Sequence, residues 1–308
     1  MPVSKSDIAN LMLPGLRTEF QKAYATSPTP TYEQIATIIP STLDTERYGW
    51  LGSVPKMREF LAERQIKGLN NFDFSIKNKT WESTIGVERA AIEDDQTGAL
   101  KLQVQTLAQE ARRHPDELVM NLLINSYAAN TQPITLCYDG LSLVHAAHLR
   151  PDGTNGQCNY FNVALSAATL KANISAMMNF KDDTGKPLNL IPDTLVVGPE
   201  LMWTAMELLE MPGVVTATPS LSSNVLQGKL KLVVNPYLSG DYDVYWYTLC
   251  TSSIRPLIFQ NRLAPEFTSM EAESESGFMR DTYAYGVRAR YNAGAGFWPA
   301  LIGNIVTT

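Results

Sequence analysis

Residues 97–128 read TGALKLQVQTLAQEARRHPDELVMNLLINSYA, and their apolar spacing is that of one long α-helix. Apolar residues recur at steps of three and four, at Leu100, Val104, Leu107, Ala111, Leu118 and Leu122, which places them on one helix face. Pro115 lacks a backbone N–H and crowds the preceding turn, but the pattern resumes in phase, so we expect a kink near His114. The helix would be roughly 45 to 50 Å long, about the diameter of a compact chain of this length. The sequence therefore predicts an extended subunit built on one spine helix.

Composition limits the class of protein. The chain has 308 residues, 44% hydrophobic and 18% charged, with a net charge of −6 and no run rich in lysine or arginine. This length and apolar content predict a large core and more than one lobe. The low charged fraction fits either ordinary variation or a subunit that buries much of its surface in partners. Sequence-independent nucleic-acid binding is disfavoured, because that affinity comes from neutralising phosphates. The unpatterned set Cys137, Cys158 and Cys250, and the absence of a secretory or membrane-spanning apolar run, favour an unexported chain.

Residues 1–45 resemble an arm. A short amphipathic helix is predicted through Leu16, Phe20 and Tyr24, and the two prolines in residues 27–31 end it. Residues 33–41 then favour a short extended piece. The arm has too little apolar surface to offset the entropy of ordering it alone. It therefore either frays or docks on another surface.

Residues 46–92 predict an extended loop. Pro55 is well placed to begin a short helix. Polar and apolar residues alternate on both sides of a Lys77-Asn78-Lys79 turn, the apolar ones being Phe72, Phe74, Ile76, Trp81, Ile85 and Val87. This pattern is typical of a β-hairpin turning at Asn78. An isolated hairpin is marginal in water, so it needs either its own core or a neighbour to lie on.

The remaining sequence predicts two lobes. Residues 140–250 interleave short apolar strands with helices that begin at Ser166 and Pro199, which favours an α/β lobe. Residues 251–308 return to strands. The clearest alternation in the chain is Tyr283, Tyr285, Val287, Ala289 and Tyr291 on one face, with Arg288 and Arg290 opposite. These closing strands and residues 93–139 are predicted to form the second lobe.

Six stretches, taken together and in order, resemble the major head subunit of Mu-like bacteriophages, a member of the tailed-phage major capsid fold. They are YGWLGSVPKMREF, FDFSIKNKTWESTIGVERAAIEDDQTG, HPDELVMNLL, YDGLSLVHAAH, LVVGPEL and DTYAYGVRARY. The resemblance implies an α+β fold: an N-terminal arm (1–45), an extended β-hairpin loop (46–92), a peripheral domain with a spine helix and a small antiparallel sheet (93–139 and 251–308), and an α/β axial domain (140–250).

The resemblance also implies a function. The chain is expected to self-assemble, as hexamers and pentamers, into the icosahedral head shell around the phage double-stranded DNA, without sequence-specific DNA binding. Because the arm begins almost at Met1, a separate scaffold protein is expected, together with a portal and possible decoration proteins. The protein is expected in the virion, after assembly in the host bacterial cytoplasm. A non-viral compartment shell of the same fold is an alternative.

The predicted contacts between subunits are the large apolar residues of the arm and the loop. They are Leu16, Phe20, Tyr24, Trp50, Phe60, Phe72, Phe74 and Trp81.

An enzyme is the other alternative, but the sequence contains few motifs that would support one. His145 and His148, flanked by Cys137 and Cys158, are the best metal candidate, and a metal-dependent hydrolase would use this loop. Their spacing lacks the close cysteine pair of common structural zinc sites. Ser53 and Lys56 match a serine–x–x–lysine pattern without its companion motifs. No phosphate-binding or nucleophile-elbow motif occurs. We therefore expect no enzymatic activity, no catalytic or metal-binding residue and no cofactor.

Overall fold

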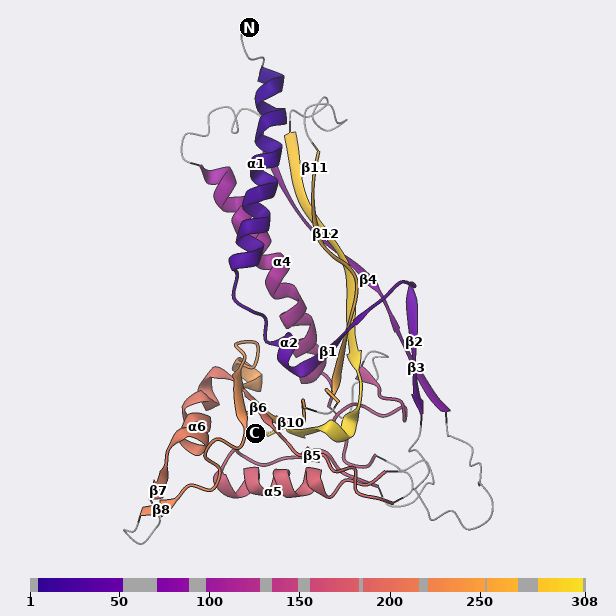
Figure 1. The fold of residues 1–308 in the computed structure, drawn as a ribbon, viewed down its shortest axis with the longest axis vertical. Coiled ribbons are helices and arrows are strands. Elements are labelled where there is room, and N and C mark those ends of the chain that lie inside the picture. Colours follow the sequence, from indigo (N-terminus) through magenta and orange to yellow (C-terminus); the bar gives the residue numbers. More distant parts are fainter. Residues whose placement is uncertain are drawn as a thin grey trace, which may run out of the picture.

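The computed structural model describes residues 5–51, 71–88, 98–127, 135–148, 156–182, 185–215, 221–252, 254–270 and 282–306. The molecule is elongated, with long helices and strands running side by side above a second, smaller lobe (Figure 1). Of the helices in these ranges, none combines the length and the apolarity needed to cross a membrane.

The spine helix is α4, Ala99–Ile124, and it runs through Pro115 without a break. It begins after Gly98, whose φ of 71° is the left-handed conformation that glycine adopts most readily. The predicted apolar face is buried at Leu100, Val104, Leu107 and Leu122. The predicted spine helix is therefore confirmed, while the kink near His114 stays a prediction.

One face of α4 covers a four-stranded sheet in the order β1-β11-β12-β4. These strands are β1 (Ala36–Pro40), β11 (Leu257–Met270), β12 (Thr282–Ala295) and β4 (Lys79–Glu88). The predicted alternation in β12 is confirmed: the three tyrosines, Val287 and Ala289 are buried and Arg288 is exposed. Strand β11 is one long strand, and its register against β12 shifts between Asn261 and Glu266.

A second sheet forms the smaller lobe, in the order β5-β13-β10-β6-β9. Its strands are β5 (Tyr160–Phe161), β13 (Leu301–Asn304), β10 (Trp246–Leu249), β6 (Thr194–Val197) and β9 (Lys231–Val234). The prediction assigned all of residues 251–308 to the lobe of the spine helix. Instead, β13 pairs with β10 and β5, so the chain returns to the second sheet at its end.

Helices α5 (Ala167–Met178) and α6 (Pro199–Glu210) flank this second sheet (Figure 1). Both were predicted, and both begin as expected. The Ser166 hydroxyl accepts from the Thr169 backbone N–H and Thr169 bonds back, which makes a capping box; Pro199 stands in the first turn of α6. The lobe is completed by a two-stranded sheet of β7 (Gly213–Val215) and β8 (Leu221–Ser223), and by the short helices η2 (Gly240–Tyr242) and η3 (Trp298–Ala300).

The helix of the arm is longer than predicted. Helix α1, Lys5–Thr26, lies along α4, and a single turn, α2 (Tyr32–Ile35), leads into β1 (Figure 1).

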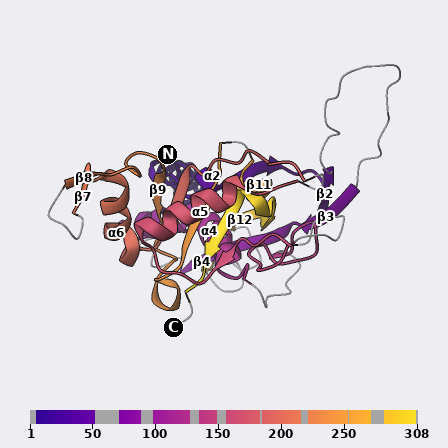
Figure 2. The same ribbon diagram turned by 90° about the horizontal axis from the view of Figure 1, so that it is seen from below.

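The prediction of a hairpin that turns at Asn78 is wrong, because its two strands do not pair with each other. Strand β3 (Asn71–Lys77) pairs with β2 (Thr45–Leu51), whereas β4 pairs with β12. Asn78 is the single residue between β3 and β4, and its side chain is fixed by two hydrogen bonds. Its Nδ2 donates to Ser41 Oγ and to the Leu43 carbonyl, both at 2.8 Å. We call β2 and β3 the ribbon; in Figure 2 it lies at one end of the molecule, with α6, β7 and β8 at the other.

Candidate functional site

The arm packs on its own subunit. Phe20 is only 3% exposed, and its ring lies 5.2 Å from that of Phe267 on β11. Leu16 is buried in the same cluster, between α4 and β12. Tyr24 is half-buried, with the Arg112 guanidinium 5.3 Å from its ring centroid. The spine helix and the sheet of the same chain bury Leu16 and Phe20 almost completely, so these two side chains offer a neighbour little surface, contrary to expectation. Contact of Tyr24 with a neighbour stays a prediction.

A polar junction fixes the base of the arm to both lobes. The Asp116 carboxylate of α4 accepts hydrogen bonds from the Thr31 backbone N–H at 2.9 Å, the Thr31 hydroxyl at 3.0 Å and the Tyr32 backbone N–H. Asn235, which follows β9 in the second lobe, donates to the same Thr31 hydroxyl. Arg255 donates to the carbonyls of Glu33 and Ala36. Arm, spine helix and second lobe therefore meet at Thr31.

The ribbon is anchored at one end. The rings of Tyr48 and Phe74 stack with centroids 5.4 Å apart, and the Tyr48 hydroxyl donates to Gln260 Oε1 at 2.7 Å. Burial raises the pKa of Tyr48 to about 12. Trp50 and Phe72 are opposite each other in the register of the two strands, nearer the other end; their side chains lie outside the described part of the structure. Phe60 lies in residues 52–70, outside the described part of the chain. Contact of these residues with a neighbour stays a prediction.

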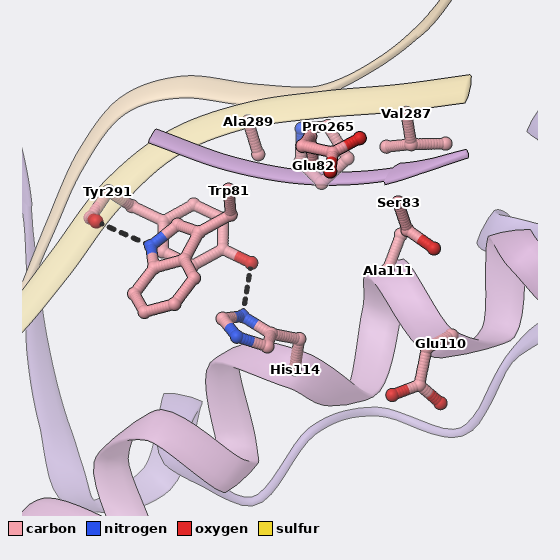
Figure 3. Close-up of a pocket in the computed structure, with 10 residues that line it drawn as sticks. All are labelled: Trp81, Glu82, Ser83, Glu110, Ala111, His114, Pro265, Val287, Ala289 and Tyr291. Atoms are coloured by element: carbon pink, nitrogen blue, oxygen red, sulfur yellow. Dashed lines mark hydrogen bonds between the residues drawn. The ribbon is translucent and has the colours of Figure 1, made fainter. Parts of the chain in front are cut away.

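Trp81 forms one wall of a pocket between the spine helix and the sheet (Figure 3). Its indole Nε1 donates to the Tyr291 carbonyl at 2.9 Å, and its ring packs against the His114 imidazole with centroids 4.5 Å apart. The Tyr291 hydroxyl and His114 Nδ1 are hydrogen-bonded at 2.7 Å. We call this the Trp81 pocket. It holds about 240 Å³ and is also lined by Glu82, Ser83, Glu110, Ala111, Pro265, Val287 and Ala289.

Burial shifts the pKa values of two side chains in this pocket, His114 and Tyr291. Desolvation lowers the pKa of His114, although Glu117 and Glu110 partly oppose the shift. Burial raises the pKa of Tyr291 far above its ordinary value. At neutral pH the hydrogen-bonded pair is therefore uncharged, and the negative charge near it belongs to the glutamates. Sequence reasoning missed the pocket, because its residues come from four segments, on β4, α4, β11 and β12, with no shared motif.

In the loop with His145 and His148, the side chain of His148 packs in the protein interior. His148 is fully buried, its Nδ1 lies 2.6 Å from Asp139 Oδ2, and its ring stacks on Trp298 with centroids 4.2 Å apart. Burial raises the pKa of the Cys137 thiol well above its usual value. The Cys158 thiol donates to the Tyr160 carbonyl at 2.9 Å. Within the described ranges, no three His, Cys, Asp or Glu side chains are grouped so as to hold a metal ion.

The spine helix beside a sheet, the second α/β lobe and the projecting ribbon define the class: a major capsid protein of the tailed-phage fold. Solved capsid structures agree. The procapsid protein of bacteriophage JBD30 matches with a TM-score of 0.56 and 32% identity, covering 99% of this chain and 77% of that one. A virus-like particle from Pyrococcus furiosus, at 8% identity and a TM-score of 0.54, covers 94% of this chain and 98% of that one and shows the fold alone.

The chain belongs to the family of Mu-like prophage major head subunits, gpT, whose sequence model matches residues 9–164, 160–238 and 239–305. It is similar to the FluMu prophage major head subunit of Haemophilus influenzae, with 26% identity over 95% of this chain and 71% of that protein. It is equally similar to the major capsid protein of Escherichia phage Mu, with 26% identity over 98% of this chain and 74% of that protein.

The function follows from this membership. The chain is the major capsid protein of a Mu-like phage, a structural component of the virion that assembles with copies of itself into a multi-subunit shell. The comparisons favour neither the hydrolase nor the compartment shell.

Proposed function

We propose that the ribbon and residues 52–70 join this subunit to a neighbour when copies close, as hexamers and pentamers, into an icosahedral head around double-stranded DNA. One observation carries the proposal: β2 pairs with β3, and neither is hydrogen-bonded to any other strand of the described chain. A two-stranded ribbon is marginal in water. Contact with an adjacent copy would cover it, and a closed symmetric shell repeats that contact at every subunit.

The arm has a different role in this proposal. Because Leu16 and Phe20 are already buried, the arm stiffens its own spine helix and is not the main tie between copies. The polar junction at Thr31 keeps the arm in register with both lobes.

Further partners are proposed from the family. A separate scaffold protein would guide assembly in the host bacterial cytoplasm, and a portal would occupy one vertex. The JBD30 capsid is described as decorated with minor capsid protein trimers, which supports a decoration protein here. A net charge of −6 supports an interior that holds DNA without sequence-specific binding. The role is structural, and we assign no catalytic step.

Two forms of the chain test the proposal. The full chain, purified alone and with its scaffold, is sized by sedimentation and imaged by electron microscopy, beside a variant in which a short Gly-Ser turn replaces residues 52–70. We expect the full chain to form closed shells and the variant to stay a folded, small species, checked by circular dichroism. Normal shells from the variant would refute the role of the ribbon.

A further inference from the structure

Two buried amide side chains lie beneath the base of the ribbon. Gln260 of β11 and Asn292 of β12 are opposite each other in the register of these strands, so both side chains are on one face of the four-stranded sheet. Gln260 is fully buried and Asn292 almost fully. Burial of a polar group is costly unless hydrogen bonds replace its contacts with water, so each amide needs partners. We call these two residues the amide pair.

The amide pair holds both strands of the ribbon. The Tyr48 hydroxyl of β2 donates to Gln260 Oε1 at 2.7 Å, and Gln260 Nε2 donates to the Ile76 carbonyl of β3 at 3.3 Å. Asn292 Nδ2 donates to the Lys77 carbonyl, where β3 ends, at 2.7 Å. A carboxamide carries both an acceptor and a donor. Gln260 therefore holds β2 through its oxygen and β3 through its nitrogen, which an apolar side chain could not do.

Close packing supports the ribbon at the same place. Gly294 lies two residues beyond Asn292 on β12 and so faces the same way. The almost fully buried Ile76 side chain lies directly on the Gly294 backbone, because a Cβ atom added to Gly294 would be only 2.4 Å from Ile76 Cδ1. The base of the ribbon therefore rests on bare backbone beside the amide pair.

The ribbon is packed less tightly on its β1 side. A pocket of about 190 Å³ is lined by Tyr48 and Phe74 of the ribbon and by Thr37 and Ile39 of β1. Because these side chains leave space between them, apolar packing there does not determine how far the ribbon inclines toward β1. The hydrogen bonds of the amide pair do so instead. Burial raises the pKa of Tyr48 to about 12, so its hydroxyl keeps the proton that it donates at neutral pH.

We propose that Gln260 is a positioning residue, which sets the angle of the ribbon on its subunit and thereby the angle at which neighbouring copies meet. The inference rests on the proposed function, in which the ribbon joins copies. A repeated contact closes a shell only if its rotation fits the symmetry. A tilt of about 10° at the base moves the far end of the seven-residue strand β2 by about 4 Å, because a strand rises about 3.3 Å per residue.

Removing the amide tests this role. Gln260→Met keeps the length of the side chain and removes both hydrogen-bonding groups. We expect the subunit to fold, by circular dichroism, yet to give at least tenfold fewer closed shells of the natural diameter, with open or uneven particles in electron microscopy. The matched control is Thr248→Val, a fully buried polar residue of the second sheet, which should assemble normally. Normal shells from Gln260→Met, or equal loss from the control, would overturn the proposal.

A covalent lock separates the angle of the ribbon from general stability. Ile76→Cys with Gly294→Cys joins the ribbon to β12 where the two already touch, and brings two Cβ atoms within the roughly 4 Å that a disulfide needs. In the Gln260→Met chain we expect the oxidised lock to restore closed shells to within twofold of the natural yield, and reduction before assembly to remove that gain. In the natural chain the lock should leave the shells unchanged.

The lock gives clear contrary outcomes. A disulfide that does not form, one that forms without restoring shells, or one that stops the natural chain from closing would each contradict the proposal. If Gln260→Met fails to fold, Tyr48→Phe takes its place, since it keeps the ring and removes only the hydroxyl that donates to Gln260. The same loss of closed shells, and the same rescue by the lock, are then expected, and normal shells from Tyr48→Phe would refute the assignment.

The proposed function and this inference fail separately. If replacing residues 52–70 leaves shells intact, the proposed role of the ribbon fails. If that replacement blocks closure while Gln260→Met forms normal shells, the ribbon keeps its role and only the assignment of Gln260 is wrong.

Discussion

Single side chains make the connections between parts of this subunit. Asp116 satisfies backbone donors at the start of α2 and also holds the Thr31 hydroxyl, which in turn accepts from Asn235 of the second lobe. Removing the carboxylate would leave two backbone N–H groups and a hydroxyl without an acceptor, and unmade hydrogen bonds of partly buried groups are costly.

Asp116→Ala is therefore expected to lower the free energy of unfolding by about 2 kcal/mol, as the loss of a capping carboxylate does. Urea titration followed by circular dichroism measures this. Glu207→Ala on the exposed side of α6 is the matched control, with an expected change within about 0.5 kcal/mol. Equal effects of the two substitutions would show that the junction contributes nothing specific.

His114 makes stability depend on pH. Burial lowers its pKa in the folded state, so protonation favours the unfolded chain. The contribution of His114 is thus present above its ordinary pKa of about 6.5 and is lost as the pH falls through the folded value. Between pH 7.5 and 5.5, the urea midpoint of the natural chain should fall further than that of His114→Gln. The pKa values of Glu19, Glu46 and Asp193 are also lowered, but these carboxyl groups change stability only at lower pH, and they do so equally in both proteins. Parallel curves for the two proteins would contradict this role.

At the level of elements, the sequence pattern predicted those helices and strands that depend mainly on contacts between residues close in the sequence. The spine helix, α5, α6 and β12 follow from periodicity and capping residues, and the buried faces predicted for the spine helix and β12 agree with the structure. The hairpin error has a long-range cause. Nothing between Phe72 and Val87 shows that β4 pairs with β12 or that β3 pairs with β2, because those partners lie far away in the sequence.

The arm shows the same limit. Its apolar residues were recognised, but the surface that covers them was not, since α4, β11 and β12 come together only in the fold. Phe20→Ala is expected to destabilise the isolated subunit by about 3 to 5 kcal/mol, as loss of a buried phenylalanine does. Thermal unfolding of purified subunits measures this, with Lys22→Ala on the exposed side of α1 as control. A stable Phe20→Ala subunit would mean that the arm is held by neighbours after all.

At the level of the whole molecule, the overall design was predictable and the candidate site only in part. An elongated subunit with a spine helix and two lobes follows from helix length and strand order (Figure 1). Trp81 was singled out as a large apolar residue of the extended loop. Its setting with His114 and Tyr291 was not predicted, because residues 81, 114 and 291 share no spacing rule. Shape follows from patterns along the chain, whereas a pocket depends on which distant segments fold together.

The central claim is that the ribbon and residues 52–70 cross from one subunit to the next. A cryo-electron microscopy map of shells assembled from the full chain tests it most directly. If the ribbon and residues 52–70 join neighbours, continuous density from Leu51 leaves its own subunit and ends on an adjacent one. Density for residues 52–70 folded back on the body of its own subunit would contradict the account.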